Sequence, residues 1–450
     1  MTGSATGLFG GALERAGFAP EEVERRLAVF GPVAAAAGPM RRVEDLAWWH
    51  VPGRIEILGK HTDYAGGRSL VCATEQGMAV AAHPRDDGIL RVVDAGSGQD
   101  AEIVIVQTRD RRGDWTNYPA TVAHRLAADF GPLAGLDLTF ASDIPIAAGA
   151  SSSSALVVAV ALALIERNRL AERPEYQRNL ASTERLAGYL GAVENGRPFG
   201  EFGATGGVGT MGGSQDHTAI LCGRADAVVQ CRWDPLGIER VVPWPDHLLF
   251  VVAASGVTAE KAGGALEHYN GLARMTARLS ELVAGTGGLV GRRIVDAPAG
   301  DTFAAERARI EAAGGADAAR LLARFDQLVR ECRDYIPGMA AALEADDATA
   351  LGTIAAASQR GAETALENQI PETVGLVAMA RAAGAIGASA FGAGFGGSVW
   401  AIIDRSIRDE FIGAWERGYR AAFPARTGVR FFATRPSPGA FRLSFRPAPA

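Results

Sequence analysis

One short segment, residues 52–64, limits most strongly what this chain can fold into. It reads Pro-Gly-Arg-Ile-Glu-Ile-Leu-Gly-Lys-His-Thr-Asp-Tyr, a strand-like run that ends at a glycine and continues into polar residues. Charged and polar side chains are rarely buried without partners, so the segment is poor core material. The pattern predicts a strand that delivers polar groups to a binding site, and those groups are of the kind that hold sugar hydroxyls.

Size and composition exclude several classes of protein. A chain of 450 residues is too long for one ordinary core, which predicts about two or three domains. The formal charge of −6 gives no support for a nucleic-acid partner, and the longest apolar run, Ala155–Ile165, is too short to span a membrane. The four cysteines have no C-x-x-C spacing and fit a reduced, cytoplasmic protein without zinc or disulfides. They are Cys72, Cys222, Cys231 and Cys332.

A second motif, residues 143–155, places a glycine turn and four serines directly before a helix. The first N–H groups of a helix lack internal partners and carry partial positive charge. Serine hydroxyls add donors and can serve as a Mg²⁺ ligand. We interpret Gly149 and Ser151–Ser154 as a phosphate cradle built without a Walker lysine, whereas a single serine would favour simple helix capping.

A third motif, Phe391–Ser398, also spells G-x-G-x-x-G, but a strand follows it rather than a helix. It therefore fails as a dinucleotide fingerprint. It is either a plain hairpin turn or a loop whose backbone closely approaches another group. The sequence also contains no G-x-x-x-x-G-K-[ST], which argues against a P-loop NTPase.

The remaining chain predicts mixed strands and helices without strict alternation, which favours an α+β fold. Residues 1–45 are expected to be a leader without chemistry and with one helical stretch, Glu21–Phe30. The other expected helices are one that begins at Trp115–Pro119, then Ser151–Asn168, Tyr176–Val193, Glu267–Val283, Thr302–Ala313, Ala316–Asp334 and Val374–Ala383. The expected strands are Ala101–Val106, Leu136–Ala141, Leu248–Ala254 and Ser398–Ile403.

Two carboxylates stand near the glycine-rich stretch 203–213. Glu194 ends a predicted helix, and Asp216 follows the glycines in Gly-Ser-Gln-Asp-His. Each of them alone would be read as a solvated surface residue. Their interest depends on the motifs around them.

In this order and spacing, the three motifs resemble the GHMP kinase superfamily. The first motif and Trp115-Thr-Asn-Tyr118 are similar to the galactokinase branch. The resemblance implies a two-domain fold: a domain like ribosomal protein S5 domain 2 over residues 46–245, and a ferredoxin-like domain over residues 246–450. It also implies that ATP, Mg²⁺ and a monosaccharide meet in the cleft between the domains.

The resemblance assigns roles by position. It makes Arg54 and Asp216 catalytic, and it gives Mg²⁺ to Glu194 and Ser153. The expected nucleotide contacts are Trp115, Gly149, Ser151, Ser152, Ser153 and Ser154. The expected sugar contacts are Lys60, His61, Asp63, Gly213 and Tyr269.

The chain departs from the galactokinase pattern at three places. Glu56 replaces asparagine and Lys60 replaces glutamate, so that Lys60 either receives an anionic group such as that of a hexuronic acid or pairs with Glu56. About ten extra residues near 197–206 are expected to lie at the mouth of the site. In the second motif, Ala147, Ala148 and Ala150 replace glycine, glycine and leucine.

These observations predict an ATP-dependent sugar kinase of the galactokinase type, which acts on the anomeric hydroxyl and is monomeric. One alternative is the same reaction on a hexuronate, for which Lys60 is the support. Another is a catalytically silent relative that binds sugar and ATP, against which Arg54, Glu194 and Asp216 argue by their presence. A mevalonate-type or amino-acid kinase is disfavoured by two motifs, Trp115-Thr-Asn-Tyr118 and His61-Thr-Asp-Tyr64.

Overall fold

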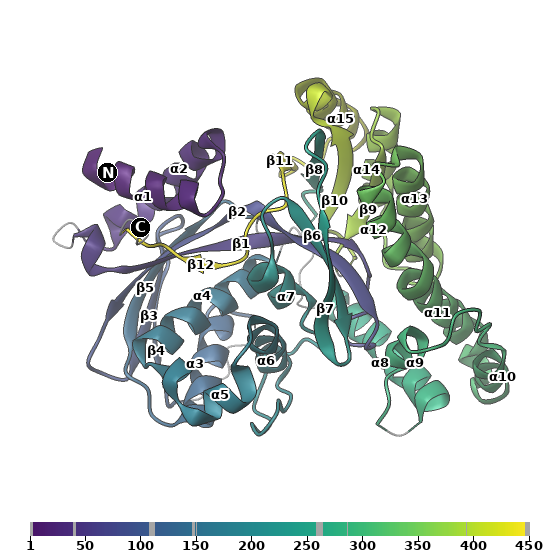
Figure 1. Ribbon diagram of the computed structural model, residues 1–450, viewed down its shortest axis with the longest axis horizontal. Helices are drawn as coiled ribbons and strands as arrows, with labels where there is room; N and C mark the ends of the chain where they lie inside the picture. Colours follow the sequence, from purple (N-terminus) through teal and green to yellow (C-terminus); the bar gives the residue numbers. More distant parts are fainter. Residues whose placement is uncertain are drawn as a thin grey trace.

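The computed structural model describes residues 3–38, 42–107, 113–145, 149, 151–257, 264–285, 287–392 and 394–445. Within them the chain forms two β-sheets with helices packed on their faces (Figure 1), which confirms the α+β prediction. The first sheet runs in the order β12-β1-β2-β5-β3-β4, and a β6–β7 hairpin is attached to β2 through β6. Its strands are β1 (Ala47–Leu58), β2 (Arg68–Pro84), β3 (Ile89–Asp94), β4 (Asp100–Val104), β5 (Leu136–Ser142), β6 (Ala227–Trp233), β7 (Leu236–Pro243) and β12 (Phe441–Arg442).

Helices cover both faces of the first sheet, because its strands alternate their apolar residues between two cores. Trp48 on β1 packs toward α1 and α2, whereas Trp49 packs toward α3, α4 and α6. In Figure 1 the first pair of helices lies above the sheet and the second group below it. The helices are α1 (Gly3–Arg15), α2 (Pro20–Ala36), α3 (Asn117–Phe130), α4 (Ser152–Arg167), α5 (Pro174–Leu180), α6 (Thr183–Asn195) and α7 (Gln215–Cys222).

The second sheet is antiparallel, in the order β11-β8-β10-β9. Alternate residues of β8 and β10 face α14 and α15 on one side and α12 on the other. The core on the α12 side also receives Ile55 and Ile57 from β1, so it joins the two sheets. The strands are β8 (Leu248–Ala254), β9 (Gly387–Phe391), β10 (Ser398–Asp404) and β11 (Arg430–Thr434).

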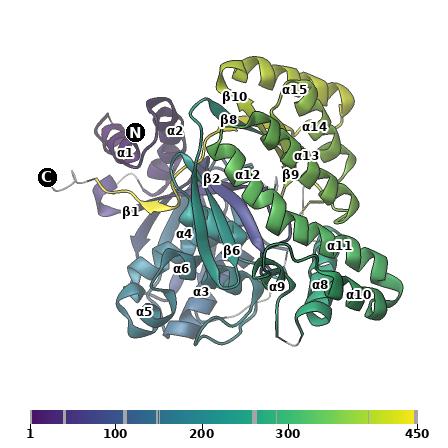
Figure 2. The ribbon, with the colours of Figure 1, turned by 45° about the vertical axis from the view of Figure 1, so that its right-hand side comes forward.

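The helices of the second half form the broad layer on the right of Figure 1, which Figure 2 brings forward. They are α8 (Gly264–Ala284), α9 (Val290–Val295), α10 (Ala304–Ala313), α11 (Ala318–Arg330), α12 (Ile336–Glu344), α13 (Ala348–Thr364), α14 (Pro371–Ala382) and α15 (Arg408–Ala422). A π-helical turn, Glu331–Tyr335, joins α11 to α12. No helix in the described part of the chain is both long and apolar enough to cross a membrane.

The expected leader, residues 1–45, carries more structure than the sequence indicated. The predicted helix Glu21–Phe30 lies within α2, but α1 was not predicted. Phe9 and Phe30 are fully buried in one core with Trp48, and their rings lie 5.0 Å apart. The two helices therefore form part of the first layer, because their apolar faces close one side of the sheet.

One further expectation differs from the structure, and the end of the chain returns to the first sheet. The single helix expected at Tyr176–Val193 is two helices, because Ser182 interrupts it and caps α6 by accepting a hydrogen bond from the N–H of Arg185. The end of the chain does not stay with the second sheet, since β12 pairs with β1 and Leu443 N–H bonds to the carbonyl of Trp48. The segments 46–245 and 246–450 therefore share the first sheet.

Candidate active site

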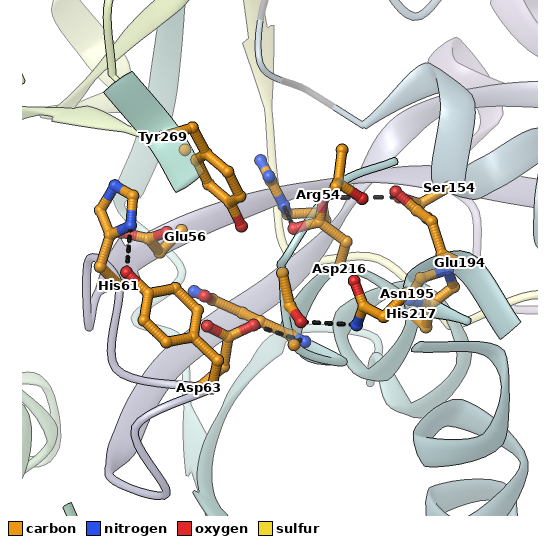
Figure 3. Close-up of a pocket in the computed structure, with 16 residues that line it drawn as sticks. Arg54, Glu56, His61, Asp63, Ser154, Glu194, Asn195, Asp216, His217 and Tyr269 are labelled. Carbon is orange, nitrogen blue, oxygen red and sulfur yellow. Dashed lines mark hydrogen bonds and ion pairs between the residues drawn. The ribbon is translucent and has the colours of Figure 1, made fainter. Parts of the chain in front are cut away.

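A polar cavity lies where β1 meets the glycine-rich stretch and the start of α8. The empty space between its lining atoms is about 540 Å³, a volume that includes open solvent. Figure 3 shows its lining, which brings together residues more than 200 positions apart. The lining residues are Arg54, Glu56, His61, Asp63, Tyr64, Ser154, Glu194, Asn195, Thr210, Gly212, Gly213, Gln215, Asp216, His217, Tyr269 and Gly392.

The two predicted catalytic residues form an ion pair that faces this cavity. Arg54 Nε donates to Asp216 Oδ1 over 2.7 Å, while the hydroxyl of Ser151 donates to Asp216 Oδ2. The Arg54 side chain is 5% exposed and that of Asp216 21%, so the carboxylate is the partner that a ligand can reach. Arg54 also donates through Nη1 to the carbonyl of Gly149. One guanidinium therefore joins a reactive carboxylate to the expected phosphate cradle.

Glu194 lies beside this pair and provides an oxygen donor for a cation. Its Oε2 atom is 3.4 Å from Ser154 Oγ and 3.2 Å from His217 Nε2. Carboxylate and hydroxyl oxygens suit Mg²⁺, which proteins commonly hold through one or two carboxylates together with substrate phosphates. The described residues contain no group of three or more His, Cys, Asp or Glu side chains around one point. Glu194 and Ser154 together offer two oxygen ligands, which fits Mg²⁺ that takes further ligands from nucleotide phosphates.

The serine nearest to Glu194 is Ser154, whereas the sequence assigned the metal to Ser153. Ser152 and Ser153 are half-buried in the first turn of α4, and the lining of the cavity within the described chain does not include them. Ser151 adopts a left-handed conformation with φ of 61°. The four serines therefore divide, with Ser151 bonded to Asp216 and Ser154 facing Glu194.

The segment after β1 supplies the other wall of the cavity. Asp63 Oδ2 accepts a hydrogen bond of 3.4 Å from the N–H of Gln215. A Cβ atom at Gly213 would lie 2.3 Å from the same oxygen, so only glycine permits this close approach. His61 Nδ1 is 2.7 Å from the hydroxyl of Tyr64, and its ring lies 5.3 Å from that of Tyr269. The sugar contacts expected at these positions, apart from Lys60, do meet in one place.

Lys60 is not part of the cavity lining in the described chain. Its Nζ atom turns toward the second half of the protein, 3.0 Å from Ser389 Oγ and 3.3 Å from Ser358 Oγ. Ser358 in turn donates to Glu331 Oε1 over 2.5 Å. Both expectations for Lys60 are therefore wrong. Its amine does not face the cavity, as contact with an anionic sugar requires, and it forms no ion pair with Glu56 among the described residues.

The other two nucleotide contacts expected from sequence, Trp115 and Gly149, lie on the same side of the first sheet as the four serines. Trp115 stands just before α3, partly buried, with its ring 6.4 Å from that of Phe140. Gly149 lies against the third motif, since a Cβ atom there would be 3.7 Å from Gly397 Cα. The third motif is therefore both a hairpin turn between β9 and β10 and a loop that closely approaches another backbone. The expectations for Ala147, Ala148 and Ala150 fall outside the described residues.

The extra residues near 197–206 do not lie at the mouth of the cavity, which corrects the expectation. Phe202 is buried, and its ring lies 5.1 Å from that of Phe130 and 5.7 Å from that of Tyr189. The apolar side chains of this segment draw it back onto the helices below the sheet. None of its residues lines the cavity.

Sequence reasoning missed several lining residues, of which Glu56 and His217 are the most informative. Glu56 was noted only as a departure, and His217 stands next to Asp216 without a role. The signal for Glu56 was its spacing, because residues 54 and 56 share one face of a strand.

Comparison with known proteins now decides the family. The galactokinase galactose-binding signature matches residues 41–84, and the GHMP kinase N-terminal and C-terminal domain families match residues 117–196 and 339–421. The galactokinase of Roseiflexus sp. (strain RS-1) is 31% identical over 399 residues, which are 87% of this chain and 92% of that relative. The chain belongs to the galactokinase family of GHMP kinases.

A second relative is similar over most of the chain, and two solved structures share its fold. The galactokinase of Streptomyces coelicolor is 29% identical over 420 residues, 92% of this chain and 99% of that one. Among solved structures, Lactococcus lactis galactokinase complexed with galactose aligns with a TM-score of 0.72 at 20% identity, over 91% of this chain and 98% of that one. The solved structure of L. major mevalonate kinase in complex with R-mevalonate aligns with a TM-score of 0.53 at 18% identity, over 87% of this chain and 96% of that one.

The galactokinase-family assignment fixes the class of activity and the fold. This protein is a sugar kinase, a transferase that phosphorylates an alcohol group of its acceptor. Its architecture is the two-domain GHMP kinase fold, as the sequence predicted. Residues of the matched galactose-binding signature, between Arg54 and Tyr64, line one wall of the cavity. Tyr269 and Gly392 from the second half of the chain complete the lining.

Proposed function

We propose that this galactokinase-family kinase transfers the γ-phosphoryl group of ATP to the anomeric hydroxyl of a neutral monosaccharide such as galactose. The observation that carries the proposal is the Arg54–Asp216 ion pair, which faces a cavity lined by the galactose-binding segment. The names of the related galactokinases support galactose as the first substrate to test.

Asp216 is the proposed acceptor of the hydroxyl proton. As the proton moves to this carboxylate, the anomeric oxygen bonds to the γ-phosphorus, the bond to the bridging oxygen breaks, and ADP leaves. A positioned base typically contributes about 10²- to 10⁴-fold to such a step. The contacts of Asp216 with Arg54 and Ser151 hold it in one orientation, which favours a productive alignment.

Arg54 is the proposed source of positive charge beside the transferred group. Phosphoryl transfer depends on positioning and charge neutralisation more than on covalent chemistry. Because Arg54 also binds the carbonyl of Gly149, its charge is held close to the cradle. Mg²⁺, when bound, would add further neutralisation, and Glu194 with Ser154 would hold it.

The two alternatives receive less support. A hexuronate kinase needs a cation at the sugar, and Lys60 instead bonds to Ser358 and Ser389. A catalytically silent relative is disfavoured because Arg54, Glu194 and Asp216 are all present around one cavity. Monomeric state and cytoplasmic location stay predictions from the sequence.

The test is ADP release with Mg·ATP against galactose, glucose, arabinose, N-acetylgalactosamine, galacturonate and glucuronate. We expect turnover of a neutral sugar, and a ³¹P spectrum of the product that identifies a sugar 1-phosphate. Turnover restricted to the uronates would support the first alternative. Absence of turnover with every sugar, together with measurable sugar binding, would support the silent relative.

A further inference from the structure

Glu56 is a buried carboxyl group that the proposed reaction does not use. It lies on β1 opposite Val71 of β2, and its side chain lines the cavity. Figure 3 shows it on the side of the cavity where His61 and Tyr269 lie. The residue is 3% exposed, and its Oε1 atom has no hydrogen-bond partner among the described residues. A buried oxygen without a partner is unfavourable, so a bound ligand is the natural source of its missing hydrogen bond.

The cations nearest to Glu56 in sequence are engaged elsewhere. Arg54 donates Nε to Asp216 and Nη1 to Gly149. Lys60 points its amine at Ser358 and Ser389, which belong to α13 and β9. Both cations still act on Glu56 through space, but neither is hydrogen-bonded to it among the described residues.

The charges around the cavity decide what kind of group can approach Glu56. Four carboxyl groups line it, against one guanidinium and two histidines. The carboxyl groups are Glu56, Asp63, Glu194 and Asp216, and the other groups are Arg54, His61 and His217. A further carboxylate on the sugar would meet repulsion and find no free cation in the described lining, whereas a hydroxyl or an ammonium group would meet acceptors.

We propose that Glu56 is a specificity-determining residue that accepts a hydrogen bond from a donor on the sugar, and that it rejects sugars carrying a carboxylate at that position. The proposal rests on the proposed phosphorylation of a neutral monosaccharide and refines its substrate class: sugars that present a hydrogen-bond donor to Glu56, either a hydroxyl or a protonated amine. Glu56 does not touch the reacting atoms in this account and is not a catalytic residue.

The pKa of Glu56 makes this role measurable. Burial raises it to about 7, Lys60 and Arg54 oppose that rise, and Asp216 and Asp63 add to it. An ionised carboxylate accepts a stronger hydrogen bond than a protonated one. In the wild type, kcat/KM for a hydroxyl-bearing sugar should therefore rise as the pH increases through 7, and the step attributable to this group should be absent from Glu56→Gln.

The experiment pairs changes in the protein with changes in the sugar. Wild type, Glu56→Gln and Glu56→Ala are compared on galactose, its 2-, 4- and 6-deoxy derivatives, galactosamine and galacturonate, with kcat and KM measured separately. Glu75→Gln is the matched control. Glu75 lies on β2 outside the cavity lining, accepts a 3.0 Å bond from the N–H of Arg435, and also has its pKa raised to about 7 by burial.

We expect Glu56→Ala to raise the KM for galactose at least tenfold, with kcat and the KM for ATP changed less than threefold. One deoxy sugar should be penalised at least tenfold by the wild type and should lose most of that penalty in Glu56→Ala, which identifies the contacted hydroxyl. Glu56→Gln should improve galacturonate relative to galactose at least tenfold. Glu75→Gln should change none of these ratios. If Glu56→Ala raises the KM for galactosamine as much as the KM for galactose, the ammonium group of the amino sugar donates to Glu56 as well as a hydroxyl does.

The proposal is overturned if both Glu56 variants keep the wild-type KM values and ratios between sugars. Should the variants fail to fold, equilibrium binding of galactose and galacturonate to the wild type still decides, since equal affinity for both at pH 8 overturns it. If the wild type turns over no sugar, the sugar-kinase proposal fails separately, and the same binding comparison tests Glu56.

Discussion

Two of the departures from the galactokinase pattern, Glu56 and Lys60, lie four residues apart and end in different surroundings. Lys60 is 1% exposed and enters a closed polar network of Ser358, Ser389 and Glu331. Glu56 is 3% exposed, but one of its oxygens lacks a partner within the described chain, and its side chain lines the cavity.

The contrast teaches how to separate structural from ligand-binding polar groups. A buried group whose bonds are satisfied within the protein stabilises one arrangement of the chain. Here Lys60 ties the segment that follows β1 to α13 and β9. A buried group that is left incomplete beside a cavity is available to a ligand. On this reading, Lys60 holds the sugar-binding segment in place, and Glu56 meets the sugar.

The largest effect is expected at Asp216, the partly exposed member of the catalytic pair. Asp216→Asn keeps the size of the side chain but removes the proton acceptor, so kcat should fall about 10²- to 10⁴-fold. The KM for sugar and the melting temperature should change little. Steady-state and single-turnover rates with Mg·ATP provide the measurement, and a kcat within a few-fold of the wild type would refute the assignment of the base.

The next effect should appear at Lys60 and should concern stability. Lys60→Met removes a buried amine that contacts the hydroxyls of Ser358 and Ser389, which should lower the free energy of unfolding by about 1 to 3 kcal/mol. Urea unfolding measures this loss. A Lys60→Met variant with unchanged stability and an altered sugar preference would reverse the comparison.

Glu56→Gln should raise the free energy of unfolding, whereas Lys60→Met should lower it, and the gain at Glu56 should depend on pH. The rise in pKa from 4.5 to about 7 corresponds to about 3 kcal/mol. Below pH 4.5 Glu56 is protonated in both the folded and the unfolded protein. Between pH 4.5 and 7 the unfolded state ionises first, so the wild type loses stability relative to Glu56→Gln, and above pH 7 the difference stays constant.

Thermal unfolding of wild type and Glu56→Gln at pH 4.5, 6 and 8 measures this difference. Glu75→Gln should follow a similar pH trend, because the pKa of Glu75 is also raised to about 7. Only at Glu56 should added galactose reduce the gain, since the sugar supplies the missing hydrogen bond in the wild type. Equal behaviour of both variants with and without galactose would argue against a sugar contact.

The smallest effect is expected in the segment 197–206, which lies away from the cavity. Arg178 and Glu201 form an exposed ion pair of 3.1 Å, with side chains 53% and 57% exposed. Arg178→Ala should lower stability by less than about 1 kcal/mol and leave all sugar KM values unchanged. A change in sugar preference would contradict the conclusion that residues 197–206 lie away from the sugar site.

Much of the site could be predicted because its residues occupy short motifs with fixed local geometry. Arg54 and Asp216, for example, were assigned from sequence, and the structure pairs them at 2.7 Å. The direction of the Lys60 side chain could not be predicted, because its partners Ser358 and Ser389 are about 300 positions away. The choice between Ser153 and Ser154 likewise depends on the rotation of α4 relative to Glu194.

The fold was predictable to a similar extent. The strands Leu248–Ala254 and Ser398–Ile403 were identifiable as continuous apolar runs and correspond to β8 and β10. The division between α5 and α6 carried a local signal in Ser182, which caps α6. The return of β12 to the first sheet had no local signal, because a two-residue strand shows no periodicity.

The most direct test of the account compares Glu56 and Lys60 in one experiment. The ratio of kcat/KM for galactose to that for galacturonate is measured for wild type, Glu56→Gln and Lys60→Met at pH 8. We expect that the wild type prefers galactose, that Glu56→Gln lowers the ratio at least tenfold, and that Lys60→Met changes it less than threefold. A ratio that responds to Lys60 and not to Glu56 would contradict this expectation.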